Sequence, residues 1–178
     1  MEIVIILVIL LLPVFGYISI YNTIKTYGIK VEESFSNIDV ALAKRYEVIT
    51  KLFEIAKGYA KHEKETLVKV IQVRNGMTLN EKETAYTDIE REYTRFNILS
   101  EGYPELKADA LFLNLQNAVM DTENHLAAAR RLYNSSVSYF NQKIQTFPGN
   151  LVASQLNEKS KPMLEFKKEQ IQDVKLDW

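Results

Sequence analysis

The fold is decided by residues 31–67, which read VEESFSNIDVALAKRYEVITKLFEIAKGYAKHEKETL. A stripe of side chains recurs along this stretch in ten steps over 36 residues, a period of 3.6, and only Glu63 interrupts its apolar character. The opposite face is charged and rich in lysine, so the stretch predicts one long amphipathic helix. The stripe consists of Val31, Phe35, Ile38, Leu42, Tyr46, Ile49, Phe53, Ala56, Ala60, Glu63 and Leu67.

Two more helices are expected after a stop at Gly76. Thr78 and Glu81 have the spacing of a capping box and begin a second helix, whose stripe is Ala85, Ile89, Tyr93, Phe96 and Leu99. A third stripe runs from Leu111 to Phe147, again in ten steps over 36 residues. It consists of Leu111, Leu115, Ala118, Thr122, Leu126, Ala129, Tyr133, Val137, Phe140, Ile144 and Phe147.

The first and third stripes have equal length, which favours lengthwise pairing of their helices. We expect an antiparallel pair in which Val31 faces Phe147, with the second helix covering part of the seam in a direction that the sequence leaves open. No alternation of period two persists, so the predicted fold is all-α: an elongated antiparallel bundle of long helices that follows an N-terminal transmembrane helix.

The transmembrane helix is predicted from residues 3–24, which contain no charged side chain. Residues 3–12 are all aliphatic, and at ~1.5 Å per residue the run matches a hydrocarbon core of ~30 Å. A cleaved signal peptide is the rival interpretation, but no basic residue precedes the run and no small-x-small site follows it. The span-defining residues are Ile3, Leu12, the internal Pro13, and Tyr17 and Tyr21 at its end.

We therefore expect an anchor over residues 1–24, a long-helix bundle over 25–150, and a tail over 151–178 that begins with a short helix. Lys25, Lys30, Lys44 and Arg45 follow the anchor and no Lys or Arg precedes it. Basic flanks stay in the cytoplasm, so the sequence predicts a single-pass protein of the cell membrane with a cytoplasmic C-terminal part.

Composition excludes several kinds of chemistry. The 178 residues contain no cysteine, which removes disulfides, thiolate nucleophiles and Cys-ligated metals. The net charge of −1 gives no case for nucleic acid. The six glycines are far apart, and no phosphate-binding or nucleophile-elbow motif occurs. We expect no enzyme activity, no cofactor, no bound metal and no small-molecule substrate.

The polar residues of the two long helices were weighed as a site. His62 and Glu63 begin like a zinc-protease motif, but Thr66 stands where the second histidine is required. The glutamate that a di-iron bundle places three residues before each histidine is also missing. We favour a polar seam that fixes helix register, with a partner-binding groove as the alternative. The candidates are His62, Glu63, Asp121, Glu123, His125, Arg130, Arg131 and Asn134.

Four motifs along the chain are SNIDVALAKRY at 36–46, KGYAKHEKETL at 57–67, DTENHLAAARRLYN at 121–134 and QTFPGNLVA at 145–153. Together they resemble the LemA family of bacterial and archaeal membrane proteins. The resemblance implies a helical, single-span protein with no established enzymatic activity, and membrane metalloproteases among its candidate partners. The chain departs from the family at Leu156-Asn157-Glu158, where many members have an aromatic-Gly-aromatic word.

The function expected from all of this is a non-enzymatic scaffold or adaptor, which presents a helical bundle at the membrane to other membrane proteins or to a second copy. Two alternatives stay open. One is a metal-dependent enzyme built on the two histidines and their neighbouring glutamates. The other is a lipid- or curvature-binding module, in which residues 151–178 lie on the bilayer. An antiparallel third helix would also return Phe147, Pro148, Leu151 and Val152 to the lipid surface.

Overall fold

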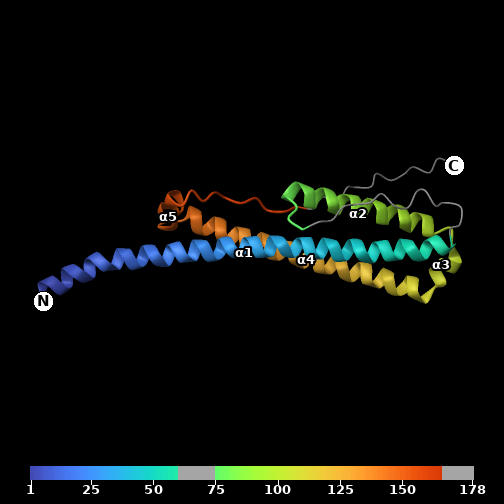
Figure 1. Ribbon diagram of the computed structural model, residues 1–178, viewed down its shortest axis with the longest axis horizontal. Coiled ribbons are helices and arrows are strands. Elements are labelled where there is room, and N and C mark those ends of the chain that lie inside the picture. Colours follow the sequence, from blue (N-terminus) through green and yellow to red (C-terminus); the bar gives the residue numbers. More distant parts are fainter. Residues whose placement is uncertain (60–74, 166–178) are drawn as a thin grey trace. The chain divides into compact units, whose positions relative to one another are not determined.

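The computed structural model describes residues 1–59 and 75–165, and within them all regular structure is helical (Figure 1). The all-α prediction is therefore confirmed. In chain order the helices are α1 (Glu2–Tyr59), α2 (Leu79–Ser100), α3 (Pro104–Ala108), α4 (Ala110–Gln145) and α5 (Gly149–Gln155).

Helix α1 joins the apolar N-terminal run and the first amphipathic stripe without a break, and Pro13 lies inside it. In the part of the chain that the structure describes, no helix has an apolar stretch long enough to cross a membrane. The structure thus does not support the transmembrane helix expected over residues 3–24. The side chains at positions 4–6, 8 and 9 of that run lie outside the described residues, as do residues 60–74 of the predicted first stripe.

The chain forms two compact units, which are described separately. Unit 1 contains Met1–Phe35 and Arg130–Met163, and unit 2 contains Ser36–Ala129 and Leu164–Trp178. The boundaries expected after residues 24 and 150 both fall within unit 1.

In unit 1, α1 and the second half of α4 run antiparallel, as expected. The ring of Tyr27 stacks on Tyr139 with centroids 6.0 Å apart, and Phe35 packs on Tyr133 at 5.3 Å. The assumed register was wrong, because the position opposite Val31 falls between Tyr133 and Tyr139 rather than at Phe147. Phe147 instead lies beyond the end of α4 with 79% of its surface exposed.

The chain after α5 folds back along α4. Helix α5, expected from Leu151, begins at Gly149 and ends in a motif in which the Asn157 and Glu158 amides donate to the Ser154 and Ala153 carbonyls. Asn157 has a φ of 53°, a left-handed conformation that favours Gly or Asn. The following segment is fixed to α4 by hydrogen bonds from Gln145 to Ser160, in both directions between Asn141 and Lys161, and from Tyr133 to the Pro162 carbonyl.

In unit 2, α1, α2 and α4 meet in one core. Phe96 of α2 packs on Phe53 of α1 at 4.8 Å and on Phe112 of α4 at 6.0 Å. Helix α2 has the predicted capping box between Thr78 and Glu81. Residues further along α1 contact residues further along α2, in the pairs Asp39–Lys82, Arg45–Glu90 and Phe53–Phe96. Helix α2 therefore runs parallel to α1, a direction that the sequence left open.

Burial along the helices follows a seven-residue repeat. In α4, Phe112, Val119, Leu126, Tyr133 and Phe140 are each at most 4% exposed. The 3.6-residue stripe was therefore wrong at both ends, where Leu111 and Phe147 are exposed, because a 3.6 period drifts away from a seven-residue repeat over five heptads. Asp109 also sets this register, since its carboxylate accepts hydrogen bonds from the Leu111 and Phe112 amides at 2.7 and 3.1 Å.

Candidate functional site

The seven-residue repeat places charged side chains inside unit 2. In α1 it consists of Ile24, Val31, Ile38, Arg45 and Leu52, all at most 2% exposed. In α2 it consists of Lys82, Ile89 and Phe96, all at most 1% exposed. Arg45 and Lys82 thus occupy positions that an aliphatic side chain would normally fill, which makes their surroundings the first candidate for a site.

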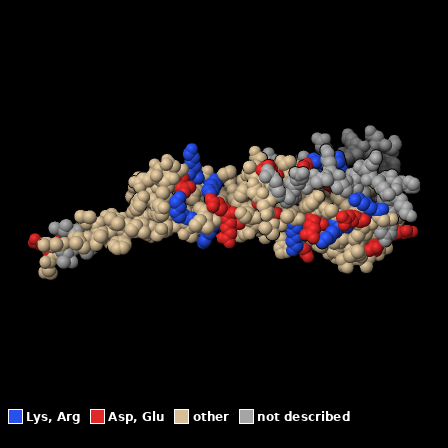
Figure 2. Space-filling view, in the orientation of Figure 1, with Lys and Arg blue, Asp and Glu red and all other residues tan. Residues whose placement is uncertain are grey.

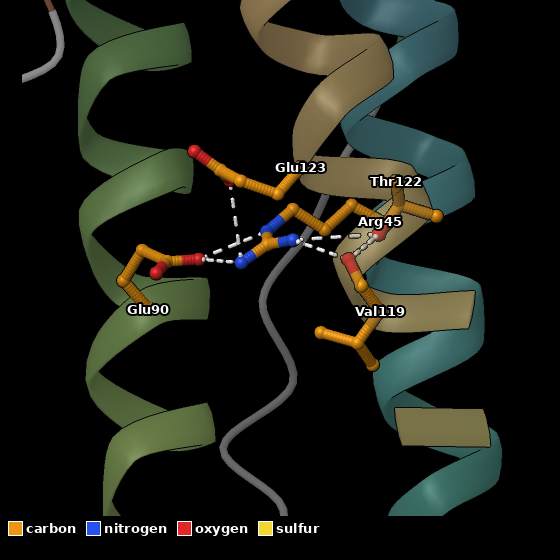
Figure 3. A network of polar contacts seen from close by, with 5 residues as sticks. All are labelled: Arg45, Glu90, Val119, Thr122 and Glu123. Atoms are coloured by element: carbon orange, nitrogen blue, oxygen red, sulfur yellow. Dashed lines mark hydrogen bonds and ion pairs between the residues drawn. The ribbon is translucent and has the colours of Figure 1, made fainter. Parts of the chain in front are cut away.

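Arg45 joins three helices through every nitrogen of its guanidinium group (Figure 3). Its Nε and Nη2 donate to Glu90 Oε1 on α2, the former at 2.9 Å. Its Nη1 donates to the Val119 carbonyl at 3.1 Å and to Thr122 Oγ1 at 3.3 Å, both on α4. Thr122 in turn donates to the same carbonyl at 2.7 Å.

Glu123 completes this network with an ion pair rather than a hydrogen bond. Its Oε2 lies 3.4 Å from Arg45 Nη2 (Figure 3). The Arg45 side chain is 3% exposed, whereas those of Glu90 and Glu123 are about a third exposed. The cation is therefore inside and the two acidic side chains are partly exposed, although Glu123 Oε2 itself is buried without a hydrogen bond. Partial exposure of the acids keeps the desolvation cost lower than a fully buried triad would have.

A second buried pair involves Asp39, six residues before Arg45 on α1. Asp39 forms an ion pair with Lys82, whose side chain has no exposed surface. The second carboxylate oxygen of Asp39 accepts a hydrogen bond from the Gly76 amide at 3.1 Å. This hydrogen bond ties the turn before α2 to α1. Gly76 has a φ of 76° in that turn, a conformation that a residue with a Cβ rarely adopts.

The sequence-predicted residues lie in several places. Glu123 contacts Arg45, whereas Asp121 and His125 on the same helix are exposed. Arg130, Arg131 and Asn134 belong to unit 1; Arg131 is exposed and the other two are half-buried. His62 and Glu63 lie outside the described residues.

Sequence reasoning missed Arg45 as a packed residue, together with Glu90, Asp39 and Lys82. The signal that identifies the cations is the seven-residue spacing, because Arg45 falls on the line of Ile38 and Leu52. A 3.6-residue stripe runs through Leu42, Tyr46 and Ile49 instead and leaves Arg45 on its edge. The acids have no comparable signal, since Glu90 is one of many glutamates on α2.

The network is suited to holding helices in register. Within residues 1–59 and 75–165, no group of three or more His, Asp or Glu side chains is arranged to hold a metal ion. The buried charges face one another across the helices, and a polar side chain at a heptad core position penalises any sliding of one helix along another.

Comparison with known proteins gives this architecture a family. A model described as the LemA family matches residues 34–178, which include the whole Arg45 network. The chain belongs to the LemA family. A LemA-family relative, Protein LemA from Metamycoplasma hominis, is 27% identical over 148 residues, covering 80% of this chain and 68% of its own length. The resemblance read from the sequence words is thereby confirmed at the level of the LemA family.

Proposed function

We propose that this LemA-family chain is a non-enzymatic scaffold held in the cell membrane by the first part of α1. The observation that carries the proposal is the exposure of that part of the helix. Its large apolar side chains are 37–79% exposed, and the charged side chain nearest to them is Glu2 at the helix start. They are Ile3, Leu7, Leu10, Leu11, Leu12, Val14, Phe15, Tyr17, Ile18 and Tyr21.

A surface of this kind calls for an apolar environment. Proteins in water rarely leave a contiguous apolar patch of such extent uncovered. A bilayer covers all sides of a helix at once, whereas a partner helix would cover one stripe and leave the others in water. The 22 uncharged residues from Ile3 to Ile24 also match the thickness of the hydrocarbon core, and this supports insertion across the membrane rather than along it.

The scaffold part of the proposal is supported by how the charges of unit 2 are used. Arg45 forms ion pairs with Glu90 and Glu123, and Asp39 forms one with Lys82, so these groups join the helices of unit 2. A rigid helical surface confined to a membrane raises the effective concentration of whatever it binds there. The partners proposed are other membrane proteins, a metalloprotease among them, or a second copy of the chain, with the helices on the cytoplasmic side.

Extraction of membranes with alkaline carbonate tests the anchor. The full-length chain should stay in the membrane pellet. A variant with Leu10→Arg and Leu11→Arg should be released, because each arginine near the middle of a span costs about 2.5–3.5 kcal/mol. The matched control is Leu132→Arg, at an exposed position of α4, which should stay in the pellet. Release of the unaltered chain by carbonate would contradict the anchor.

Crosslinking in intact membranes followed by mass spectrometry tests the scaffold. Discrete crosslinked species that contain a second protein, or two copies of this chain, are the expected result. A chain that stays in the membrane yet crosslinks to nothing would argue against a scaffold and leave only the anchor standing.

A further inference from the structure

A second surface of unit 1 has the properties of a membrane contact: the turn between α4 and α5. We propose that this turn and the first residues of α5, together residues 146–151, rest in the headgroup region of an anionic bilayer beside α1, so that unit 1 touches the membrane at two places. The inference rests on the proposed anchor and assigns a lipid-contacting role to residues outside it.

The turn packs against the part of α1 at which the apolar run ends. A shallow depression lies between them, lined on one side by Ile20, Thr23 and Ile24 and on the other by Phe147, Pro148 and Gly149. Ile20 and Ile24 follow Ile3 by roughly 26 to 32 Å of helix, which is about one hydrocarbon thickness. If Ile3 lies at one face of the bilayer's hydrocarbon core, the turn lies at the opposite face.

The apolar side chains of the turn point outward from a firmly built base. Phe147 is 79% exposed and Leu151 is 58% exposed, whereas Val152 and Ala153 on the other side of α5 are buried. Gly149 approaches α4 so closely that a Cβ there would stand 2.1 Å from the Lys143 carbonyl oxygen. The exposed phenylalanine and leucine are therefore presented by packed backbone.

The charge pattern around the turn fits an anionic lipid surface. No acidic residue occurs between positions 3 and 31 or between positions 143 and 157. The nearest acid after the turn is Glu158, which is bound to Lys25 at 2.8 Å. Lys30, Lys143 and Lys159 are exposed, and each cation near a cytoplasmic leaflet contributes about 1 kcal/mol of attraction.

Figure 2 shows the same pattern on one face of unit 1, where the described residues beyond Glu2 are uncharged as far as the region of α5, before the first Lys or Arg is reached. An aromatic ring, a leucine and flanking lysines are the residues that proteins place at a membrane interface. A soluble partner would explain the apolar pair, but not its position level with the end of the apolar run.

Fluorescence of a single attached probe tests the contact. Because the chain contains no cysteine, Phe147→Cys carries one label at the turn, and Leu132→Cys carries one label roughly 20 Å away along α4. Both positions are exposed, so neither change disturbs packing. The full-length variants are labelled with the environment-sensitive dye NBD and reconstituted in vesicles of phosphatidylcholine and phosphatidylglycerol, with and without a lipid that carries a spin label near the headgroup.

The expected result is a blue-shifted emission from position 147 that the spin-labelled lipid quenches, and an unshifted, unquenched emission from position 132. A blue shift without quenching would mean that protein covers Phe147, and equal quenching at both positions would mean that the whole of unit 1 lies on the bilayer. Either result overturns the inference. Flotation of the same vesicles separates the two proposals: a chain that floats with an unquenched position 147 keeps the anchor and loses the second contact, whereas a chain that does not float loses both.

Discussion

At the scale of single residues, the most informative position is Arg45. It lies on the same heptad line as Ile38 and Leu52, and its burial equals theirs. A guanidinium group at such a position is tolerated because α2 and α4 supply an acceptor for each of its nitrogens. A sequence read with a period of 3.5 identifies the buried cation, but the acceptors depend on which helices surround it, and only the folded chain supplies that information.

Replacing Arg45 should therefore destabilise unit 2. Arg45→Met keeps much of the side-chain volume and leaves Glu90 and Glu123 without their cation. Breaking a buried ion pair lowers the free energy of unfolding by about 3–5 kcal/mol. Because the side chains of Glu90 and Glu123 are about a third exposed, we expect a decrease near the lower end of that range, about 3 kcal/mol. Urea unfolding of the full chain in detergent micelles, followed by circular dichroism, measures this.

Lys44→Met is the matched control for that measurement. It removes the neighbouring cation, which is exposed. Substitutions at exposed positions usually change the free energy of unfolding by at most about 0.5 kcal/mol. Equal stability of the two variants would mean that the network does not hold the helices together.

At the scale of elements, helix positions were easier to predict than helix faces. The capping box at Thr78 and the turn at Phe147-Pro148-Gly149 mark ends within two residues of those observed, because caps and breakers act locally. The face that α4 buries was predicted correctly from Thr122 to Ile144 and wrongly beyond, since Leu111 is exposed and Phe112 is covered. Which of two adjacent apolar residues points inward depends on the partner helix.

The connection between α4 and α5 offers a test at this scale. Gly149→Ala should destabilise unit 1 by about 1–3 kcal/mol, because its Cβ would overlap the Lys143 backbone and packed backbone has little room to move. Gly58→Ala should do the opposite. No heavy atom lies within 4 Å of a Cβ at Gly58, the penultimate residue of α1, and alanine is favoured over glycine in a helix by up to about 1 kcal/mol. A shift of the same sign in both variants, measured by urea unfolding, would contradict this account.

At the scale of the whole molecule, the helical periodicity predicted the all-α fold and short sequence motifs predicted the family. The path of the chain after α5 was not predictable. Residues 158–162 have no regular structure and are placed by single hydrogen bonds, such as those between Asn141 and Lys161. A single asparagine carries no periodic signal, so segments of this kind are invisible until their partners are known.

The proposed topology makes a prediction for the intact chain. Glu2→Cys and Lys107→Cys each introduce one thiol, at the start of α1 and in α3. In intact cells that express the chain, a membrane-impermeant maleimide should label the first and spare the second until the membrane is permeabilised, because the lysines that follow the anchor favour the cytoplasm. The reverse pattern would place the helices outside.

The continuity of α1 has a mechanical consequence. An anchor joined to its cargo by a loop lets the cargo swivel, whereas here the apolar run passes into the packed part of unit 1 as one helix. The rotational phase between the proposed anchor and that packed part is therefore set by residue count, and each residue added or removed between them turns one against the other by about 100°. In the proposed topology, a neighbouring protein in the same bilayer would always meet the same side of unit 1.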